Sequence, residues 1–240
     1  MLLNSRIRAN LDAVRDRLAR AARRAGRDPS AVRLVAVSKT FDADHVRAAA
    51  AAGQVEFGEN RVQEALEKIA QTSDIPVRWH LVGHLQANKV RKAATAFAVI
   101  HSVDSLDLLE RLDRAAVELA TAPEVLVQVD LAGETTKFGA PPEAARQVAE
   151  AASRARAVRL AGLMVLPPLF DDPELARSYF VRLRRFRDEL IAAGLPSGQL
   201  RELSMGMSHD FEIAIEEGAT IVRIGTAVFG ARLPRIESGG

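Results

Sequence analysis

The stretch Leu34-Val35-Ala36-Val37-Ser38-Lys39-Thr40 joins a short apolar run directly to a polar turn. Consecutive apolar residues bounded by a turn are typical of a buried β-strand. Similar runs recur along the chain, so that strands are predicted at 34–37, 55–57, 79–82, 98–100, 125–129, 160–165, 200–203 and 221–224. Stretches with helical periodicity lie between these runs, and helices are predicted at 44–52, 61–70, 105–120, 142–155, 173–193 and 209–217. The chain therefore alternates between strand and helix over most of its length.

Regular alternation of strands and helices favours parallel strands that are buried on both faces of a sheet. Eight strand runs in a chain of 240 residues predict an α/β fold with a single (β/α)8 TIM-type barrel, which typically takes about 250 residues. A doubly wound open sheet is the alternative. The first turn reads Ser38-Lys39-Thr40 and lacks the glycine fingerprint of a dinucleotide-binding fold, which favours the barrel.

An amphipathic helix is predicted over residues 5–26, ahead of the first strand, with Gly26 as its end. Its apolar residues recur at helical spacing: Ile7, Leu11, Val14 and Leu18. The rest of the chain contains no linker, repeat or low-complexity segment, and only 234–240 has the composition of a loose tail. We therefore expect one domain over residues 1–240.

Composition excludes several classes of function. The chain has no cysteine, which excludes disulfides, thiolate nucleophiles and cysteine-based metal or iron–sulfur sites. The 33 basic residues nearly balance 31 acidic ones, and no basic stripe alternates with aromatic residues, so nucleic-acid binding is not expected. No apolar run approaches the length of a membrane span and the N-terminus does not resemble a signal peptide, so we expect a cytoplasmic protein. The five histidines form no cluster with metal-ligand spacing, and no metal is expected.

Lys39 is the residue that most strongly suggests chemistry. It is one of five lysines among 33 basic residues, and it directly follows the first predicted strand. Active sites of (β/α)8 barrels lie at the C-terminal ends of the strands. A partly desolvated amine at such a position can form a Schiff base. The alternative interpretation is a lysine that extends from the strand end into solvent.

Two glycine-containing turns follow the last two predicted strands, Ser204-Met205-Gly206-Met207-Ser208 and Gly225-Thr226. Barrels often build phosphate sites from these two loops, because glycine lets backbone N–H groups converge on an anion. Ser208 also occupies the expected N-cap position of the helix at 209–217. Ordinary turn and capping chemistry is the alternative interpretation. A Schiff-base lysine and a phosphate-binding turn in one barrel together suggest pyridoxal phosphate as the cofactor.

Several stretches share the pattern of a known family. They are VAVSKT at 35–40, FGENRVQE at 57–64, WHLVGHLQANK at 79–89, GLM at 162–164, LSMGMS at 203–208, VRIGT at 222–226 and FG at 229–230. With these stretches, which span most of residues 34–230, the chain resembles the pyridoxal phosphate homeostasis proteins, relatives of the barrel domain of alanine racemase. Arg61 departs from the family pattern, in which an aromatic residue is common, without disturbing the core motif.

The resemblance implies roles for individual residues. Lys39 would hold the cofactor as a Schiff base, and Asn60 and Arg223 would border its ring. The phosphate region would contain the other site residues, which are Ser204, Ser208, Gly225 and Thr226. The stretch ETTKFG also fits the family pattern and makes Lys137 a candidate second lysine near the barrel mouth.

Two classes of function fit a barrel that binds pyridoxal phosphate. One is a binding protein that acts in intracellular vitamin B6 homeostasis without dedicated turnover, and the other is an amino-acid racemase. The resembled racemases need a tyrosine base opposite the lysine, whereas the one tyrosine here, Tyr179, falls in the helix at 173–193. A permanently charged Arg223 beside the pyridine nitrogen would also disfavour protonation of the ring. Both features favour the non-catalytic binding protein.

A Schiff-base aldolase acting on a sugar phosphate is a third interpretation. It ranks last because its lysine would lie later in the barrel. We expect a monomer that binds the cofactor, and enzymes still lacking this cofactor are hypothetical protein partners.

Overall fold

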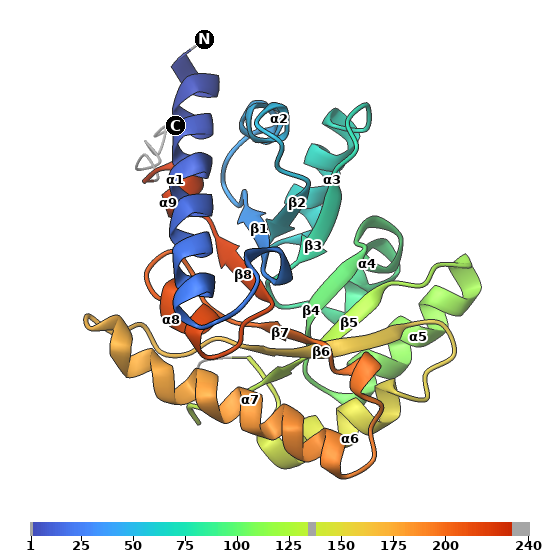
Figure 1. Ribbon diagram of the computed structural model, residues 1–240. Coiled ribbons are helices and arrows are strands. Elements are labelled where there is room, and N and C mark those ends of the chain that lie inside the picture. The colour runs from blue at the N-terminus through green and yellow to red at the C-terminus, as the bar shows by residue number, and fades with distance from the viewer. Residues whose placement is uncertain (1, 134–137, 232–240) are drawn as a thin grey trace, which may run out of the picture.

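The strands form one closed barrel in which every strand is parallel to its neighbours and β8 pairs with β1 (Figure 1). The computed structural model describes residues 2–133 and 138–231. The eight strands of this part are β1 (Arg33–Val37), β2 (Glu56–Glu59), β3 (Arg78–Leu81), β4 (Val99–Val103), β5 (Glu124–Val129), β6 (Arg159–Val165), β7 (Glu202–Ser204) and β8 (Ile221–Ile224). The predicted (β/α)8 barrel is confirmed, because the strands follow one another around it in chain order.

Helices surround the barrel and connect its strands. Within the described residues they are α1 (Leu2–Arg24), α2 (Ala43–Ala51), α3 (Val62–Gln71), α4 (Val90–Ala96), α5 (Leu106–Leu119), α6 (Pro142–Ala152), α7 (Arg177–Ala192), α8 (Phe211–Glu216) and α9 (Thr226–Phe229). Short 3-10 turns occur at Pro29–Ala31, Ala87–Lys89, Pro173–Ala176 and Ser197–Gln199. The predicted helix ranges do not include α4 and α9. These have seven and four residues, too few to show a clear amphipathic repeat.

The seventh strand is shifted relative to its prediction. The apolar run predicts a strand at 200–203, whereas β7 begins at Glu202 and ends at Ser204. Leu200 instead ends a 3-10 turn, and its side chain is buried all the same. Apolar patterning cannot distinguish a buried turn residue from a buried strand residue. The register of β7 is set by β6, where Gly162 pairs with Glu202.

Helix α1 covers the side of the barrel near β8 and β1, and it packs against α2, α8 and α9 (Figure 1). The predicted apolar stripe is buried as expected, at Ile7, Leu11, Val14 and Leu18. The helix starts at Leu2, three residues earlier than predicted, and ends at Arg24. Gly26 follows with a φ of +66°, a left-handed conformation that glycine adopts readily after a helix.

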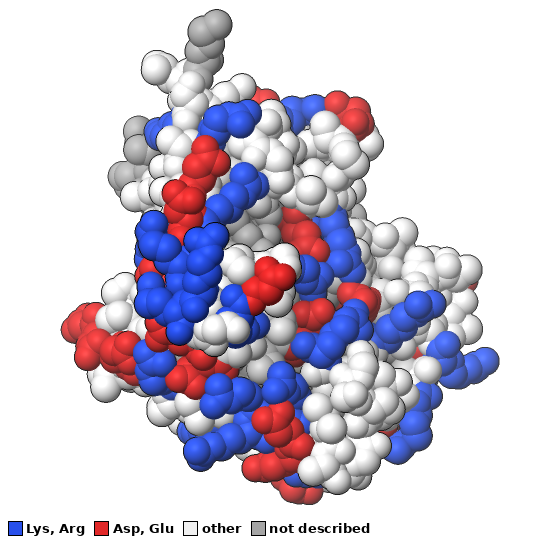
Figure 2. Space-filling view, in the orientation of Figure 1, with Lys and Arg blue, Asp and Glu red and all other residues white. Residues whose placement is uncertain are grey.

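Charged side chains of both signs are interleaved over the face seen in Figure 2. Arg17 and Arg24 of α1, for example, each lie 2.9 Å from a carboxylate of α8, on Glu212 and Glu216. Such exposed pairs contribute at most about 1 kcal/mol each, so the buried apolar stripe is the main attachment of α1. Within residues 2–133 and 138–231, no helix is long and apolar enough to cross a membrane.

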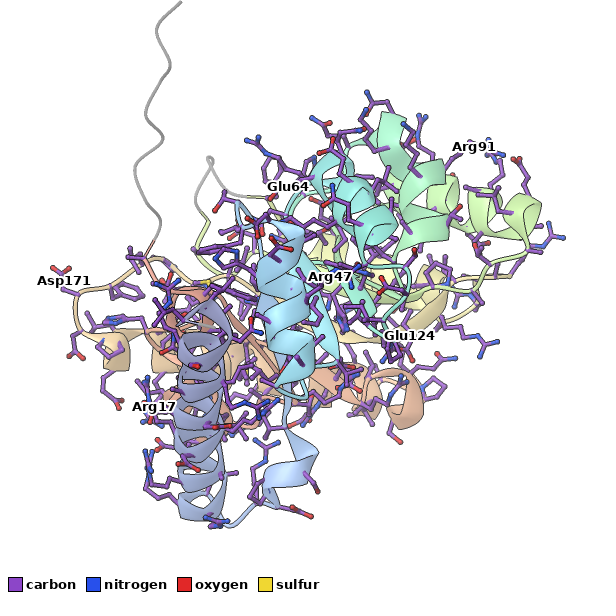
Figure 3. All side chains as sticks on the ribbon, turned by 90° about the horizontal axis from the view of Figure 1, so that it is seen from above. Arg17, Arg47, Glu64, Arg91, Glu124 and Asp171 are labelled. Atoms are coloured by element: carbon purple, nitrogen blue, oxygen red, sulfur yellow. The ribbon has the colours of Figure 1, made fainter. Side chains whose placement is uncertain are left out.

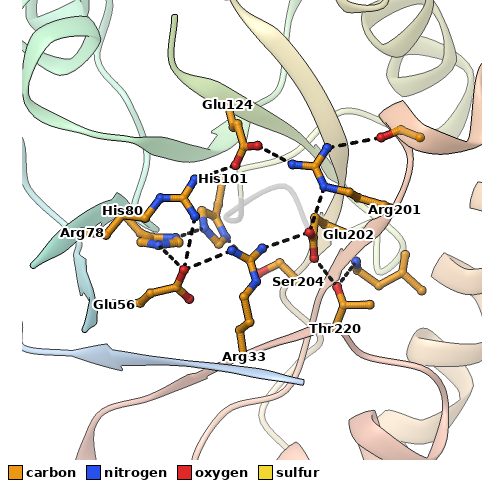
Figure 4. Close-up of polar contacts among 12 residues, drawn as sticks. Arg33, Glu56, Arg78, His80, His101, Glu124, Arg201, Glu202, Ser204 and Thr220 are labelled. Carbon is orange, nitrogen blue, oxygen red and sulfur yellow. Dashed lines mark hydrogen bonds and ion pairs between the residues drawn. The ribbon is translucent and has the colours of Figure 1, made fainter. Parts of the chain in front are cut away.

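Side chains of the strands fill the N-terminal end of the barrel interior. Arginine and glutamate side chains alternate there in a closed ring of ion pairs, the arginine–glutamate ring (Figure 4), which consists of Arg33, Glu56, Arg78, Glu124, Arg201 and Glu202. An apolar cluster adjoins this ring and contains Val35, Val99, Leu126, Ala161, Met164 and Ile221. Because the ring and the apolar cluster fill the N-terminal part of the barrel, a ligand site is expected at the C-terminal ends of the strands.

Candidate functional site

Lys39 and the turn at Gly225 lie at the ends of neighbouring strands. Val35 of β1 pairs with Arg223 of β8, so the residues that follow these two strands emerge side by side. Gly225 approaches β1 closely, since a Cβ atom there would lie 3.1 Å from the carbonyl oxygen of Val37. Lys39 lies two residues after Val37, the last residue of β1, in the turn that opens this end of the barrel. An amine and a glycine turn therefore share one part of the barrel mouth.

Asn60 is held at the same end of the barrel by a close approach of Gly83. Asn60 follows β2, and Gly83 follows β3. A Cβ atom at position 83 would lie 2.3 Å from the carbonyl oxygen of Asn60, so only glycine fits there. The hydroxyl of Ser102 donates a hydrogen bond of 2.7 Å to the carbonyl oxygen of Gly83 and fixes the turn from the side of β4.

Ser208 connects the two predicted phosphate turns. Its hydroxyl oxygen accepts a hydrogen bond of 3.3 Å from the backbone N–H of Ala227, in the turn after β8. The prediction that Ser208 caps the following helix is wrong, because α8 begins only at Phe211 and the N-cap position belongs to Asp210, whose side chain makes no capping hydrogen bond. The Asp210 carboxylate accepts a hydrogen bond of 2.6 Å from the N–H of Met207, which closes a turn around Ser208. The serine hydroxyl is thereby available to the β8–α9 turn.

Arg223 and Ser204 belong to a buried chain of hydrogen bonds inside the barrel; its part from Ser204 to His80 appears in Figure 4. A guanidinium nitrogen of Arg223 donates to Ser204 Oγ at 2.5 Å. Ser204 Oγ lies 2.9 Å from His101 Nδ1, and His101 Nε2 lies 2.9 Å from His80 Nδ1. Because arginine can only donate, the chain is satisfied when each group donates to the next one down the barrel. Beyond it, His80 Nε2 lies 3.8 Å from a carboxylate oxygen of Glu56.

Burial determines the charges along this chain. It lowers the pKa of Arg223 to about 10, although Asp210 acts in the opposite direction, so the guanidinium stays charged at neutral pH. Burial also lowers the pKa of His101 well below its usual value. The pKa of His80 is lowered for the same reason, against the effect of Glu56. Arg223 is therefore a cation near the barrel mouth, and the hydrogen-bond chain below it continues through the neutral imidazoles of His101 and His80.

The predicted site residues thus differ in their surroundings. Lys39, Asn60, Gly225 and Thr226 lie at the strand ends, but the roles assigned to them stay predictions. The hydroxyl of Ser204 bonds to Arg223 and His101 inside the barrel, and a direct contact with phosphate likewise stays a prediction for this residue. Lys137 lies outside the described residues.

Sequence reasoning did not identify two clusters at this end of the molecule. Lys68 is buried among carboxylates behind the Lys39 turn, and its position four residues after Glu64 in a chain with few lysines was the available signal. The ring of Phe138 stacks on His84, with 3.7 Å between the ring centroids. His84 Nδ1 lies 3.8 Å from Asp104, a carboxyl whose pKa is raised by burial.

The residues of the barrel mouth fit pyridoxal phosphate by chemical type. The cofactor presents an aldehyde, a pyridine ring and a phosphate, which call for an amine, a polar ring border and a cradle of N–H and O–H donors. Lys39 supplies the amine. The absence of a Cβ at Gly225 lets this turn pack closely on the end of β1, and Ser208 adds a hydroxyl to the turn.

Comparisons with known proteins agree with this geometry. The family model described as alanine racemase, N-terminal domain, matches residues 9–233. A protein of Aquifex aeolicus named pyridoxal phosphate homeostasis protein is 42% identical over 92% of this chain and 96% of its own length. A protein of Pseudomonas aeruginosa with the same name is 45% identical over 95% of this chain and 96% of its own length.

Solved structures show the same barrel. PipY of Synechococcus elongatus, solved with pyridoxal phosphate bound, is 43% identical and superposes with a TM-score of 0.83 over 93% of this chain and all of PipY. Alanine racemase of Clostridium difficile is 17% identical and shares the fold, with a TM-score of 0.73 over 95% of this chain. The chain covers 57% of that racemase, which therefore contains a further part that these residues do not match.

Proposed function

Because this chain belongs to the alanine racemase N-terminal domain family, and within it to the pyridoxal phosphate homeostasis proteins, we propose that it binds pyridoxal phosphate as a Schiff base on Lys39. In this proposal it acts in intracellular vitamin B6 homeostasis without a catalytic turnover of its own. The observation that carries the proposal is the position of Lys39 beside the Gly225 turn, at the ends of the paired strands β1 and β8. The pyridoxal phosphate bound to PipY, which shares this barrel, supports the choice of cofactor.

The cofactor supplies an aldehyde and an electron-accepting ring, and the protein supplies binding and orientation. The amine of Lys39 would hold the cofactor through its aldehyde carbon, as an imine formed with loss of water. The Ser208 and Thr226 hydroxyls and the backbone at Gly225 would bind the phosphate. Asn60 and Arg223 would border the ring, with the charged guanidinium disfavouring a proton on the pyridine nitrogen.

An absorption spectrum of the purified protein with pyridoxal phosphate tests the proposal. We expect a visible Schiff-base band, and we expect borohydride reduction to fix the cofactor to Lys39, as located by peptide mass spectrometry. Lys39→Ala should abolish both signals. Lys92→Ala changes an exposed lysine of α4 and serves as the matched control that leaves both signals intact. An adduct that persists in Lys39→Ala and maps to another lysine would overturn the assignment.

A racemase needs acid–base groups on both sides of the substrate carbon. Racemisation needs one group to remove a proton from the substrate carbon and another to deliver a proton to the opposite face. Tyr179, the one tyrosine of the chain, lies on α7 outside the barrel, where its ring is 5.9 Å from that of Phe170. It is therefore not placed to act as the second base.

Incubation of the loaded protein with L-alanine and other amino acids in deuterium oxide tests this part. We expect α-deuterium exchange and loss of optical activity close to the rates given by free pyridoxal phosphate. Racemisation at about 1 s⁻¹ or faster, lost in Lys39→Ala, would restore the racemase interpretation.

We also propose that the protein is a cytoplasmic monomer and that enzymes lacking their pyridoxal phosphate are its protein partners. Light scattering of the loaded protein at several concentrations tests the monomer. Borohydride reduction fixes the cofactor covalently to the protein, so the reduced protein cannot transfer it. Activation of an apo-enzyme by the native protein, but not by the reduced protein, would support cofactor delivery.

A further inference from the structure

A buried lysine lies directly behind the turn that carries Lys39. The side chain of Lys68, on α3, is 7% exposed. Its ammonium group donates three hydrogen bonds, to the carbonyl oxygen of Ser38 at 2.7 Å, to Glu59 at 2.7 Å and to Glu64 at 2.8 Å. All three donors of the ammonium are therefore used. We call Lys68, Glu59 and Glu64 the Lys68 cluster.

The Lys68 cluster holds the peptide groups on both sides of Lys39. On one side, the carbonyl oxygen of Ser38 accepts from Lys68, and the Ser38 hydroxyl donates to Glu59 at 2.6 Å. On the other side, the backbone N–H of Thr40 donates to the same Glu64 oxygen that accepts from Lys68. Thr40 has a φ of +70°, a conformation that costs energy for a β-branched residue and needs outside support. The cluster provides that support.

The cluster contacts the back of the turn. Glu59 follows Gly58 in the strand alternation and points away from the barrel axis, towards α3. Figure 3 shows Glu64 on the α2–α3 side of the molecule, away from Arg17 on α1. The cluster therefore acts on Lys39 through the backbone of residues 38–40.

Stability alone gives little reason for such a cluster. Removing the Glu59 carboxylate and the Lys68 ammonium from water is costly, and apolar residues of the same volume are often as stable or more so. Burial raises the pKa of Glu59 in spite of Lys68, and Glu59 Oε2 is buried without a hydrogen-bond partner among the described residues. The arrangement is therefore better explained by a requirement on the geometry of the turn.

We propose that Lys68 is a positioning residue for Lys39: with Glu59 and Glu64 it clamps the peptide groups on either side of Lys39 and so directs the Lys39 amine into the barrel mouth. The inference rests on the proposed function, in which Lys39 receives the cofactor. It concerns orientation, because a misplacement of about 1 Å at a reacting group can cost about 100-fold in reactivity.

Lys68→Met tests the proposal, because it keeps the length of the side chain and removes the ammonium. We expect about tenfold weaker binding of pyridoxal phosphate, slower formation of the Schiff-base band, and a shifted band for the cofactor that does bind. In the cofactor-free protein, hydrogen exchange of the Thr40 amide should accelerate about tenfold. Circular dichroism and thermal unfolding identify a temperature at which both proteins are folded, and all measurements are made there.

Chemical rescue separates positioning from general stability. The chain contains no cysteine, so Lys68→Cys can be unfolded, aminoethylated with bromoethylamine at that position alone, and refolded. The resulting side chain restores an ammonium at nearly the same reach and should restore the affinity, the band and the Thr40 protection. Wild-type protein carried through the same steps is the control.

A second pair of variants covers the case in which Lys68→Met fails to fold. Glu64→Ala removes the acceptor of the Thr40 N–H, and Glu67→Ala removes an exposed carboxylate from the same helix. We expect weaker cofactor binding only in Glu64→Ala. The role of the cluster would be overturned if folded Lys68→Met or Glu64→Ala bound pyridoxal phosphate with wild-type affinity and gave the wild-type absorption band. This conclusion requires that the wild-type protein forms its adduct at Lys39. A wild-type adduct that maps away from Lys39 would instead overturn the proposed function, whatever the Thr40 exchange shows about the clamp.

Discussion

The two ends of the barrel are formed by the same eight strands, but their polar residues make different kinds of contact. At the N-terminal end, the arginine–glutamate ring pairs each charge with a neighbour of opposite sign, as between Arg33 and Glu202 at 3.0 Å. At the C-terminal end, Gly83 lies against the backbone of Asn60, Gly225 lies against the end of β1, and Ser208 accepts from the turn after β8.

The difference follows from where the loops are. Ring residues lie on or next to strands, so the barrel register fixes their partners, and the pairs close the barrel without needing a ligand. Residues at the other end belong to βα turns, whose conformations vary without changing the barrel. The N-terminal end is therefore expected to govern stability, and the C-terminal end to govern binding of the cofactor.

The largest effect is expected from a methyl group added beside the ring. In Gly162→Ala the new Cβ would lie 1.9 Å from the carbonyl oxygen of Glu202, so β6 and β7 must separate. We expect a loss of about 3 kcal/mol or more in the free energy of unfolding, the upper end of over-packing effects, measured by urea denaturation.

Gly83→Ala is the matched change at the other end, because its Cβ would meet the backbone of Asn60. It should shift the Asn60 turn and weaken cofactor binding more than it lowers stability. Equal losses of stability and affinity in both variants would contradict the division between the two ends.

Breaking one ion pair of the arginine–glutamate ring should lower the free energy of unfolding by less than Gly162→Ala does. Glu202 lies 3.0 Å from Arg33 and 3.2 Å from Arg201, and its side chain is 11% exposed. We expect Glu202→Gln to lower the free energy of unfolding by about 2–3 kcal/mol, between the values for surface and fully buried pairs, with unchanged cofactor affinity. Glu118→Gln, which removes an exposed pair with Arg91, should cost less than about 1 kcal/mol. A similar loss in both variants would show that the closed ring adds nothing.

Removing a hydroxyl group at the C-terminal end should instead weaken cofactor binding and leave the free energy of unfolding almost unchanged. We expect Ser208→Ala and Thr226→Ala each to weaken binding of pyridoxal phosphate by about 1.5–3 kcal/mol, the usual net contribution of one hydrogen bond to a charged group, with little change in stability. Binding of pyridoxal, which lacks the phosphate, provides the control, because the same substitutions should leave it unaffected. Titrations that show equal losses for both ligands would remove these hydroxyls from the phosphate site.

The smallest effect is expected from acid. Burial acts to raise the pKa of Glu56, but His80, Arg33 and Arg78 outweigh it and lower the pKa from 4.5 to about 2. The folded state therefore prefers the ionised carboxylate. Its contribution to stability is present above about pH 4.5 and is lost as the pH falls towards 2.

We expect this contribution to be about 1 kcal/mol after allowance for solvent screening. Urea denaturation across this pH range should give a shallower loss of stability in Glu56→Gln than in the wild type. Identical slopes would show that Glu56 is not the titrating group.

The barrel could be predicted from the sequence because its signal is local. Strand and helix periods appear within each short window, so the alternation and the position of Lys39 after the first strand need no knowledge of contacts. The same holds for the stripe of Ile7, Leu11 and Val14 that buries α1. The family resemblance, confirmed by the comparisons, likewise rests on contiguous motifs such as VRIGT at 222–226.

Only the tertiary structure decided which polar residues meet. His101 and Ser204 are 103 positions apart in the chain, and Lys68 reaches back 30 positions to Ser38. Neither Ser208 nor Asp210 caps α8 through its side chain, because the Asp210 carboxylate accepts from Met207 and the Ser208 hydroxyl accepts from Ala227. Such pairings depend on the register between strands and on the packing of helices against them, and neither quantity is encoded in the period of any single segment.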